Sequence, residues 1–217
     1  MIFTTLNTII EDIMKIIRGS IIASTEPISK RQVEDWVHQY RAELIRQDIN
    51  KGYYADPGYI QTIESLDLSP TATTGLYVTD AVIPKTINLR YKSGITWVGD
   101  ANGERLEFTG IPQSRDIWQQ HKRYTPEEIT YFKEDGRLYI RQPLDEVSAI
   151  TVKGIFENPM EVIRLADPIA DRNVPYPIPT NKVSTLKEMV IKGELKIEAV
   201  APSDTTNDSE HNPKPNQ

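Results

Sequence analysis

Residues 129–141 read ITYFKEDGRLYIR, and they carry the clearest structural signal in the chain. Two short runs rich in β-branched and aromatic residues, Ile129–Phe132 and Arg137–Arg141, flank Glu134-Asp135-Gly136. An Asp-Gly pair between such runs favours a β-hairpin, because the turn that suits two twisted antiparallel strands needs residues that accept positive φ. The stretch therefore predicts two antiparallel strands joined by a tight turn.

Further strand-like runs surround this hairpin and are separated by turn signals. They span Tyr59–Leu68, Leu76–Asp80, Thr86–Tyr91, Gly94–Val98, Glu104–Thr109 and Ala149–Phe156. A second hairpin turn is predicted at Gly99–Gly103, and a short helix at Ser114–Lys122. We therefore expect residues 56–157 to form a β-rich antiparallel domain, either a sandwich or a small barrel.

Two amphipathic helices are predicted before the β-rich region, within residues 1–55. In the first, apolar side chains recur every three or four residues over Leu6–Ile17. The second begins with a capping box of Ser29 and Gln32, followed by an apolar stripe over Val33–Leu44. Two such helices with a short link should pack as an antiparallel hairpin, which we expect to mediate oligomerisation.

The sequence after residue 157 changes character again, and residues 158–200 are predicted to form an extended arm. The stretch Pro175–Pro179 is too proline-rich for a core element and is typical of a polyproline-II segment. A short helix is predicted at 181–191, with an apolar face for which no internal partner is evident. Residues 201–217 lack Val, Ile, Leu and aromatic residues, so we expect partners alone to order them. The predicted fold class is thus α+β.

Composition excludes several classes of function. The net charge of −6 argues against a general nucleic-acid-binding surface, which needs clustered Lys and Arg. The absence of cysteine excludes disulfides, thiolate catalysis and Cys-based zinc sites. No apolar run has the length of a membrane-spanning helix, and the N-terminus lacks the pattern of a signal peptide, so a soluble protein with no membrane partner is expected.

Motifs for catalysis are also missing. The histidines His38, His121 and His211 do not have the spacing of metal ligands. The string Ser184–Lys187 matches Ser-x-x-Lys, but the other motifs of acyl-serine enzymes are absent. We therefore predict no catalytic residue, no cofactor and no metal, and a protein that is not an enzyme.

Two stretches of the sequence resemble a known family. The opening Thr5–Ile13 with Ile28–Asp48, and the closing Pro177–Met189 with Ser203-Asp204 and Asn207–Ser209, resemble the ends of virion structural proteins from crAss-like phages, which infect Bacteroidetes. The resemblance implies a head-to-tail connector, or neck ring protein, made in the host cytoplasm and assembled into the virion. Such proteins join portal and tail around the DNA channel, usually as twelve copies, with DNA only as non-specific cargo.

This function makes subunit-contact residues the candidate site. They are Arg31, Glu34, Arg41, Arg46, Trp118, Pro175, Tyr176, Pro177, Pro179, Leu186, Met189 and Val190. Two alternatives stay open at this point. One is a carbohydrate- or host-surface-binding virion module with Trp118 at its site, since an exposed indole can stack on a sugar. The other is an unrecognised enzyme with two acids held about 5–10 Å apart, for which the abundance of Asp and Glu is the only support.

Overall fold

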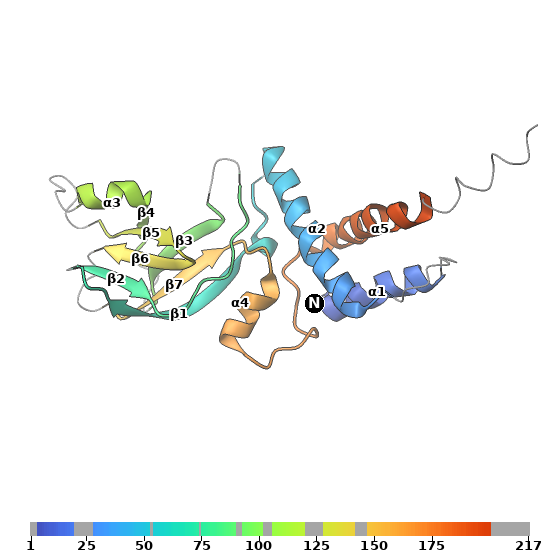
Figure 1. Cartoon of the computed structure of the whole chain (residues 1–217), viewed down its shortest axis with the longest axis horizontal. Helices are drawn as coiled ribbons and strands as arrows, with labels where there is room; N and C mark the ends of the chain where they lie inside the picture. The colour runs from blue at the N-terminus through green and yellow to red at the C-terminus, as the bar shows by residue number, and fades with distance from the viewer. Residues whose placement is uncertain are drawn as a thin grey trace, which may run out of the picture. The chain divides into compact units, whose positions relative to one another are not determined.

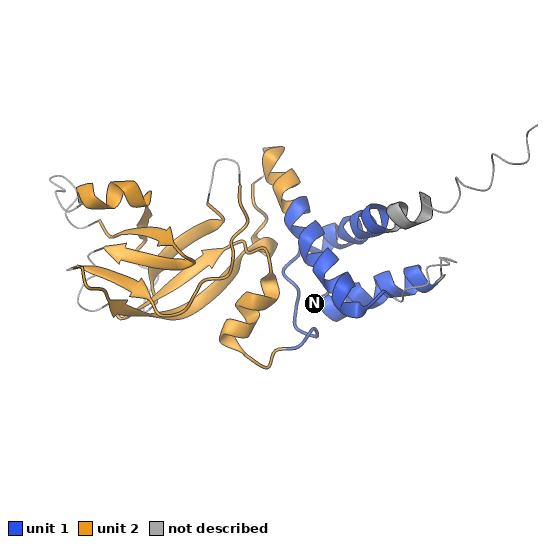
Figure 2. Ribbon diagram, viewed as in Figure 1, with its two compact units in different colours: residues 1–44, 171–217 blue, residues 45–170 orange. Residues whose placement is uncertain are grey.

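The computed structural model describes residues 4–19, 28–52, 54–73, 75–89, 93–101, 106–119, 128–141 and 147–200. The chain divides into two compact units (Figure 2). Unit 1 consists of residues 1–44 and 171–217, and unit 2 consists of residues 45–170. The end of the chain is therefore grouped with its beginning. The tail 201–217 and part of the predicted turn Gly99–Gly103 lie outside the described residues.

Unit 2 contains a seven-stranded sheet with the order β3-β7-β1-β2-β6-β5-β4 (Figure 1). The strands are β1 (Gln61–Pro70), β2 (Leu76–Thr79), β3 (Ile95–Asp100), β4 (Thr109–Gly110), β5 (Thr130–Glu134), β6 (Arg137–Arg141) and β7 (Ala149–Gly154). Only the short β4 pairs in parallel, with β5. The prediction of a mixed helical and mostly antiparallel fold is thus confirmed.

The two edge strands of this sheet are linked through the residues just before β4. The amide of Phe108 donates a hydrogen bond of 2.8 Å to the carbonyl of Val98 on β3, and Gly99 forms an antiparallel bridge with Glu107. Because β4 pairs with β5, hydrogen bonding continues from one edge of the sheet to the other. The arrangement favours the barrel over the sandwich, since closure removes unpaired strand edges.

The sheet encloses one apolar core. Residues two apart on β6 and on β7, Leu138 with Ile140 and Ile150 with Val152, belong to this core, as expected for side chains on the same face of a strand. The buried members include Ile63, Leu66, Ile95, Val98, Phe108, Leu138, Ile140, Ile150, Val152 and Phe156. The hairpin of β5 and β6 has the predicted turn, in which Asp135 and Gly136 have φ of 48° and 76°. Positive φ at both central residues is the geometry of a type I′ turn.

Three further elements belong to unit 2. They are the 3₁₀ turn η1 (Pro57–Tyr59), α3 (Gln113–Gln119) and α4 (Pro159–Ala166). The side chain of Asn158 caps α4 by accepting a hydrogen bond of 3.0 Å from the amide of Met160. Helix α4 packs on β1 and buries Val162 in the core of the sheet. Residues 159–166 are therefore helical and packed, and an extended arm is not confirmed for them.

Unit 1 contains α1 (Leu6–Gly19), most of α2 (Lys30–Asn50), the 3₁₀ turn η2 (Thr180–Lys182) and α5 (Val183–Val200). The amide of Gln32 donates to the Ser29 hydroxyl, so Ser29 caps α2 as predicted. The predicted pairing of α1 with α2 is not confirmed, because α1 packs along α5. The expectation that the C-terminal helix lacks an internal partner is wrong, since Leu186 and Val190 are buried in unit 1.

Candidate functional site

One face of α2 holds the segment that precedes α5. Glu34 and His38 are four residues apart and so lie on the same face of the helix. Arg172 donates to Glu34 Oε2 from Nε at 2.8 Å and from Nη2 at 2.6 Å. His38 Nδ1 and the Tyr176 hydroxyl are 2.9 Å apart, within a hydrogen bond. Two side chains of α2 thus fix Arg172 and Tyr176, which lie within the predicted arm.

Arg41 extends this row by one further turn of α2. Its side chain is fully buried, and Nε donates a hydrogen bond of 2.9 Å to the carbonyl of Pro177. The guanidinium also lies 5.7 Å from the centre of the Tyr176 ring, within the range of a cation–π contact. Burial raises the pKa of the Tyr176 phenol well above its ordinary value, so this group stays neutral. A buried arginine is tolerated only with partners, and here the chain's own C-terminal segment supplies them.

The structure therefore brings four candidate contact residues together inside unit 1, namely Glu34, Arg41, Tyr176 and Pro177. Leu186 and Val190 are buried in the core of unit 1, while Pro179 and Met189 are half-buried and Arg31 and Pro175 are exposed. Arg46 belongs to unit 2 and donates a hydrogen bond of 2.9 Å to Glu157. The contacts of these residues with partners stay predictions.

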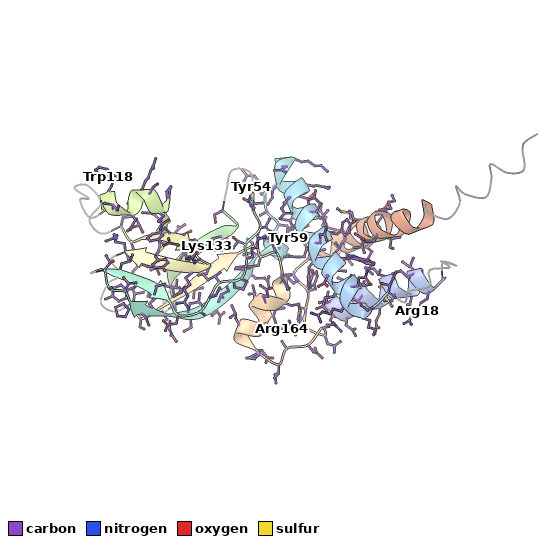
Figure 3. All side chains as sticks on the ribbon, in the orientation of Figure 1. Arg18, Tyr54, Tyr59, Trp118, Lys133 and Arg164 are labelled. Carbon is purple, nitrogen blue, oxygen red and sulfur yellow. The ribbon has the colours of Figure 1, made fainter. Side chains whose placement is uncertain are left out.

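Trp118 is exposed on α3 of unit 2 (Figure 3). Its neighbour Ile117 is exposed as well. The exposed fractions are 73% for Trp118 and 69% for Ile117. The same short helix is anchored by Asp116, which is buried with Arg141 of β6. Arg141 donates from Nε to Asp116 Oδ1 at 2.6 Å and from Nη2 to Oδ2. This hydrogen bonding raises the pKa of Arg141, and the bidentate pair fixes α3 with its apolar side chains in solvent.

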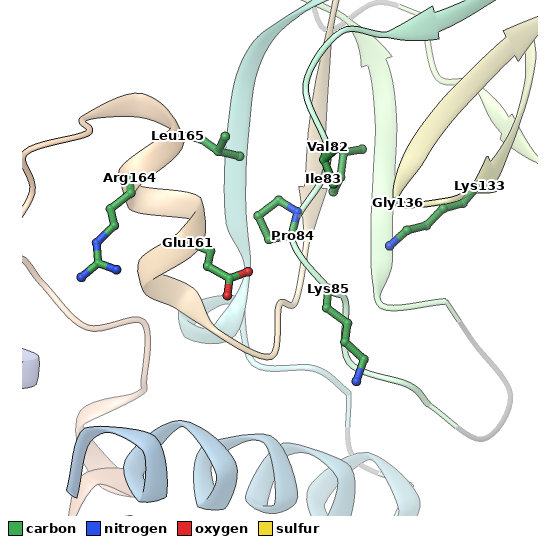
Figure 4. Close-up of a pocket in the computed structure, with 9 residues that line it drawn as sticks. All are labelled: Val82, Ile83, Pro84, Lys85, Lys133, Gly136, Glu161, Arg164 and Leu165. Atoms are coloured by element: carbon green, nitrogen blue, oxygen red, sulfur yellow. The ribbon is translucent and has the colours of Figure 1, made fainter. Parts of the chain in front are cut away.

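A cavity of about 630 Å³ lies beside the turn of the β5–β6 hairpin (Figure 4). We define the groove as its lining residues, which are Val82, Ile83, Pro84, Lys85, Lys133, Gly136, Glu161, Arg164 and Leu165. The segment after β2, the hairpin turn and α4 each contribute part of the wall. Sequence reasoning missed this site, and the apolar run Val82–Pro84 after Asp80 is the one signal that could have indicated it.

The described residues contain no group of three or more His, Asp or Glu side chains that could hold a metal ion. Among the described helices, none is both long enough and apolar enough to cross a bilayer. The described candidate residues of unit 1 lie mostly in packed internal contacts, whereas unit 2 presents the exposed pair on α3 and the groove.

A family model described as Phage tail ring protein 2 matches residues 8–215, which is nearly the whole chain. No curated protein matches the sequence.

Proposed function

Because the chain belongs to the phage tail ring protein 2 family of crAss-like phages, we propose that it is a ring-forming structural adaptor in the portal-to-tail neck of the virion. Membership of this family makes the chain a virion component that assembles with copies of itself and with other virion proteins. The neck position, a ring of twelve copies and contact with the portal protein are our proposal. In this role the protein joins portal and tail and has no catalytic function.

The observation that carries self-assembly is the exposed apolar pair on α3. Trp118 and Ile117 are held in solvent by the buried ion pair of Asp116 and Arg141, rather than left on a loose loop. Ordered, exposed aromatic side chains are typical of protein interfaces, where their apolar surface is removed from water. In a ring, a neighbouring subunit can bury these two side chains on every copy of the protein.

The charge of the chain suits a wall around DNA. With a net charge of −6, the protein repels the phosphate backbone on average, so DNA can pass as cargo without being held. We propose DNA as a non-specific neighbour and not as a ligand.

The test is the mass of the full-length protein in solution, measured by light scattering alone and with the portal protein of the same phage. A closed ring, or a complex that forms with the portal, supports the adaptor role. A strict monomer that ignores the portal refutes it. Deleting residues 175–217 is a poor test of assembly, because it removes Tyr176 and Leu186 from the core of unit 1.

A second candidate function rests on the same exposed indole. A carbohydrate- or host-surface-binding module would use Trp118 as a stacking platform for a sugar ring. In that case host glycans should raise the melting temperature of the wild type, and Trp118→Ala should abolish the shift. A melting temperature that no glycan changes argues against this function and leaves the ring adaptor.

A further inference from the structure

A ring of identical subunits needs two different surfaces on each subunit. A contact between like patches closes a two-fold dimer, whereas a head-to-tail contact between unlike patches can propagate and close into a ring. Unit 2 carries two such surfaces. One is the knob, which we define as Ile117 and Trp118 of α3, and the other is the groove.

The knob and the groove lie at opposite ends of the β5–β6 hairpin. Arg141, which anchors α3 through Asp116, pairs with Thr130 at the open end of the hairpin. Gly136 and Lys133, which line the groove, lie in the turn and next to it. The strands are paired over five positions, from Thr130 to Glu134. At about 3.4 Å per residue, the two ends are on the order of 14 Å apart, so one subunit can present both surfaces to different neighbours.

The two surfaces also match in chemistry. Val82 and Leu165 leave apolar surface exposed in the groove, which suits the side chain of Ile117. The amines of Lys133 and of Lys85, which also pairs with Glu157 at 2.9 Å, belong to the same wall (Figure 4). The face of an indole carries partial negative charge and attracts such cations, so the groove is electrostatically complementary to Trp118.

The indole N–H of Trp118 also has a possible hydrogen-bond acceptor in the groove. A buried indole N–H needs an acceptor, and the carboxylate of Glu161 is part of the groove.

We propose that the knob of one copy docks into the groove of the next copy, and that this head-to-tail contact closes the ring. The proposal rests on the self-assembly proposed above and names its interface. It assigns Trp118 as the central anchor, with Val82 and Leu165 as its apolar seat and Lys85 and Lys133 as the cations beside it.

Complementary variants test the contact. The knob variant, Ile117→Ser with Trp118→Ala, keeps a groove but has no knob. The groove variant, Val82→Glu with Leu165→Glu, keeps a knob but cannot receive one. Each variant alone should lose self-association by about tenfold or more, as is typical when a central aromatic anchor is removed. An equimolar mixture should form a one-to-one pair and no ring, since only one productive contact remains.

The matched control is Tyr54→Ala, which removes an aromatic side chain that is 95% exposed and lies in neither surface. It should assemble like the wild type. Circular dichroism and thermal melting of every variant establish that the folds are intact, because the exposed positions 82, 117, 118 and 165 tolerate substitution in the isolated subunit.

Cross-linking gives a second measurement on the full chain. The sequence has no cysteine, so Ser114→Cys on α3 with Arg164→Cys in the groove introduces the only two thiols and leaves Trp118 and Val82 in place. A disulfide requires Cα atoms within about 7 Å, and a knob seated in the groove can meet this limit. Oxidation should then yield a ladder of linked copies on a denaturing gel, which either single variant lacks.

The outcomes separate this inference from the proposed function. If the wild type forms rings and the knob variant forms them equally well, with no ladder, the knob–groove contact is wrong and the ring function stands. If the knob variant still forms rings but no longer binds the portal protein, the knob contacts the portal and not a second copy of the chain. That result overturns the inference. A wild type that is monomeric under every condition refutes both.

Discussion

Replacing Asp116 with leucine should destabilise unit 2 and release α3 from the sheet. Asp116 is 7% exposed and Arg141 is 5% exposed, and two N–H···O contacts join them. The substitution leaves the guanidinium of Arg141 buried without its carboxylate. Breaking a buried pair in this way costs about 3–5 kcal/mol, because the remaining charge has lost its solvation and its partner. Native domains have a stability of about 5–15 kcal/mol, so the loss should be large.

The assay is urea unfolding of the full chain, followed by far-ultraviolet circular dichroism and by tryptophan fluorescence. With a denaturant dependence of about 2 kcal/mol per molar urea, a loss of 4 kcal/mol lowers the midpoint by about 2 M. Arg115→Leu is the matched control, since Arg115 is an exposed charge on the same helix and should change stability by less than about 0.5 kcal/mol.

The double variant Asp116→Leu with Arg141→Met makes the test sharper. Replacing both charges with apolar side chains removes the unpaired ion, so it should recover most of the stability that either single change loses. A variant Asp116→Leu as stable as the wild type would refute the reasoning. A double variant that loses the sum of the two single losses would do the same, because it would mean that the two side chains act independently.

Three further changes probe unit 1. Gly193→Ala should destabilise α5, because the new Cβ would lie 1.8 Å from the hydroxyl of Tyr40. Alanine normally favours a helix by about 1 kcal/mol over glycine, so the same change should stabilise the protein in a Tyr40→Leu background. Thermal melting of the wild type, the two single variants and the double variant measures this reversal. Leu186→Ala should cost about 2–5 kcal/mol in urea unfolding, since this side chain is fully buried, and a loss below 1 kcal/mol would contradict the packing of α5. Asp12 accepts a hydrogen bond of 2.6 Å from Lys187, and this bond lowers the pKa of Asp12. The pair therefore stabilises the fold at pH values above the ordinary pKa of an aspartate. This stabilisation is lost as the pH falls through the lowered pKa of Asp12. Asp12→Asn should therefore cost at most about 1 kcal/mol at pH 7, given the partial exposure of the pair, and the difference from the wild type should vanish in acid; a difference that grows in acid would have the wrong sign.

Local features of the fold could be predicted because they depend on residues close together in the chain. The turn at Asp135-Gly136 requires positive φ, and the sequence places there the residues that accept it. The cap at Ser29 uses an amide three residues further on. Trp118 was predicted as a candidate contact residue, and the structure exposes its indole on α3, while its contact with a partner stays a prediction.

The candidate site could be predicted only in part, because its other members depend on distant partners. Arg41 and Tyr176 have the residue types of an interface, and the structure uses them inside unit 1. The groove joins a segment after β2, a hairpin turn and a helix that lie far apart in the chain. No spacing in the sequence signals such a cavity, since it exists only when three separate elements meet.

The sequence by itself indicated most of the strands, the helices α1 and α2 and the apolar faces of the helices, because hydrophobic periodicity, caps and turns act over a few residues, but it missed α4. Only the tertiary structure decided what covers each face. A periodic stripe shows that a side must be buried but not against which partner, so the stripe of α5 was equally compatible with a neighbouring subunit and with the chain's own α1. In the structure, α5 packs against α1 of the same chain. Ile117 and Trp118 lie in solvent, because the buried pair of Asp116 and Arg141 fixes the opposite side of α3 to the sheet.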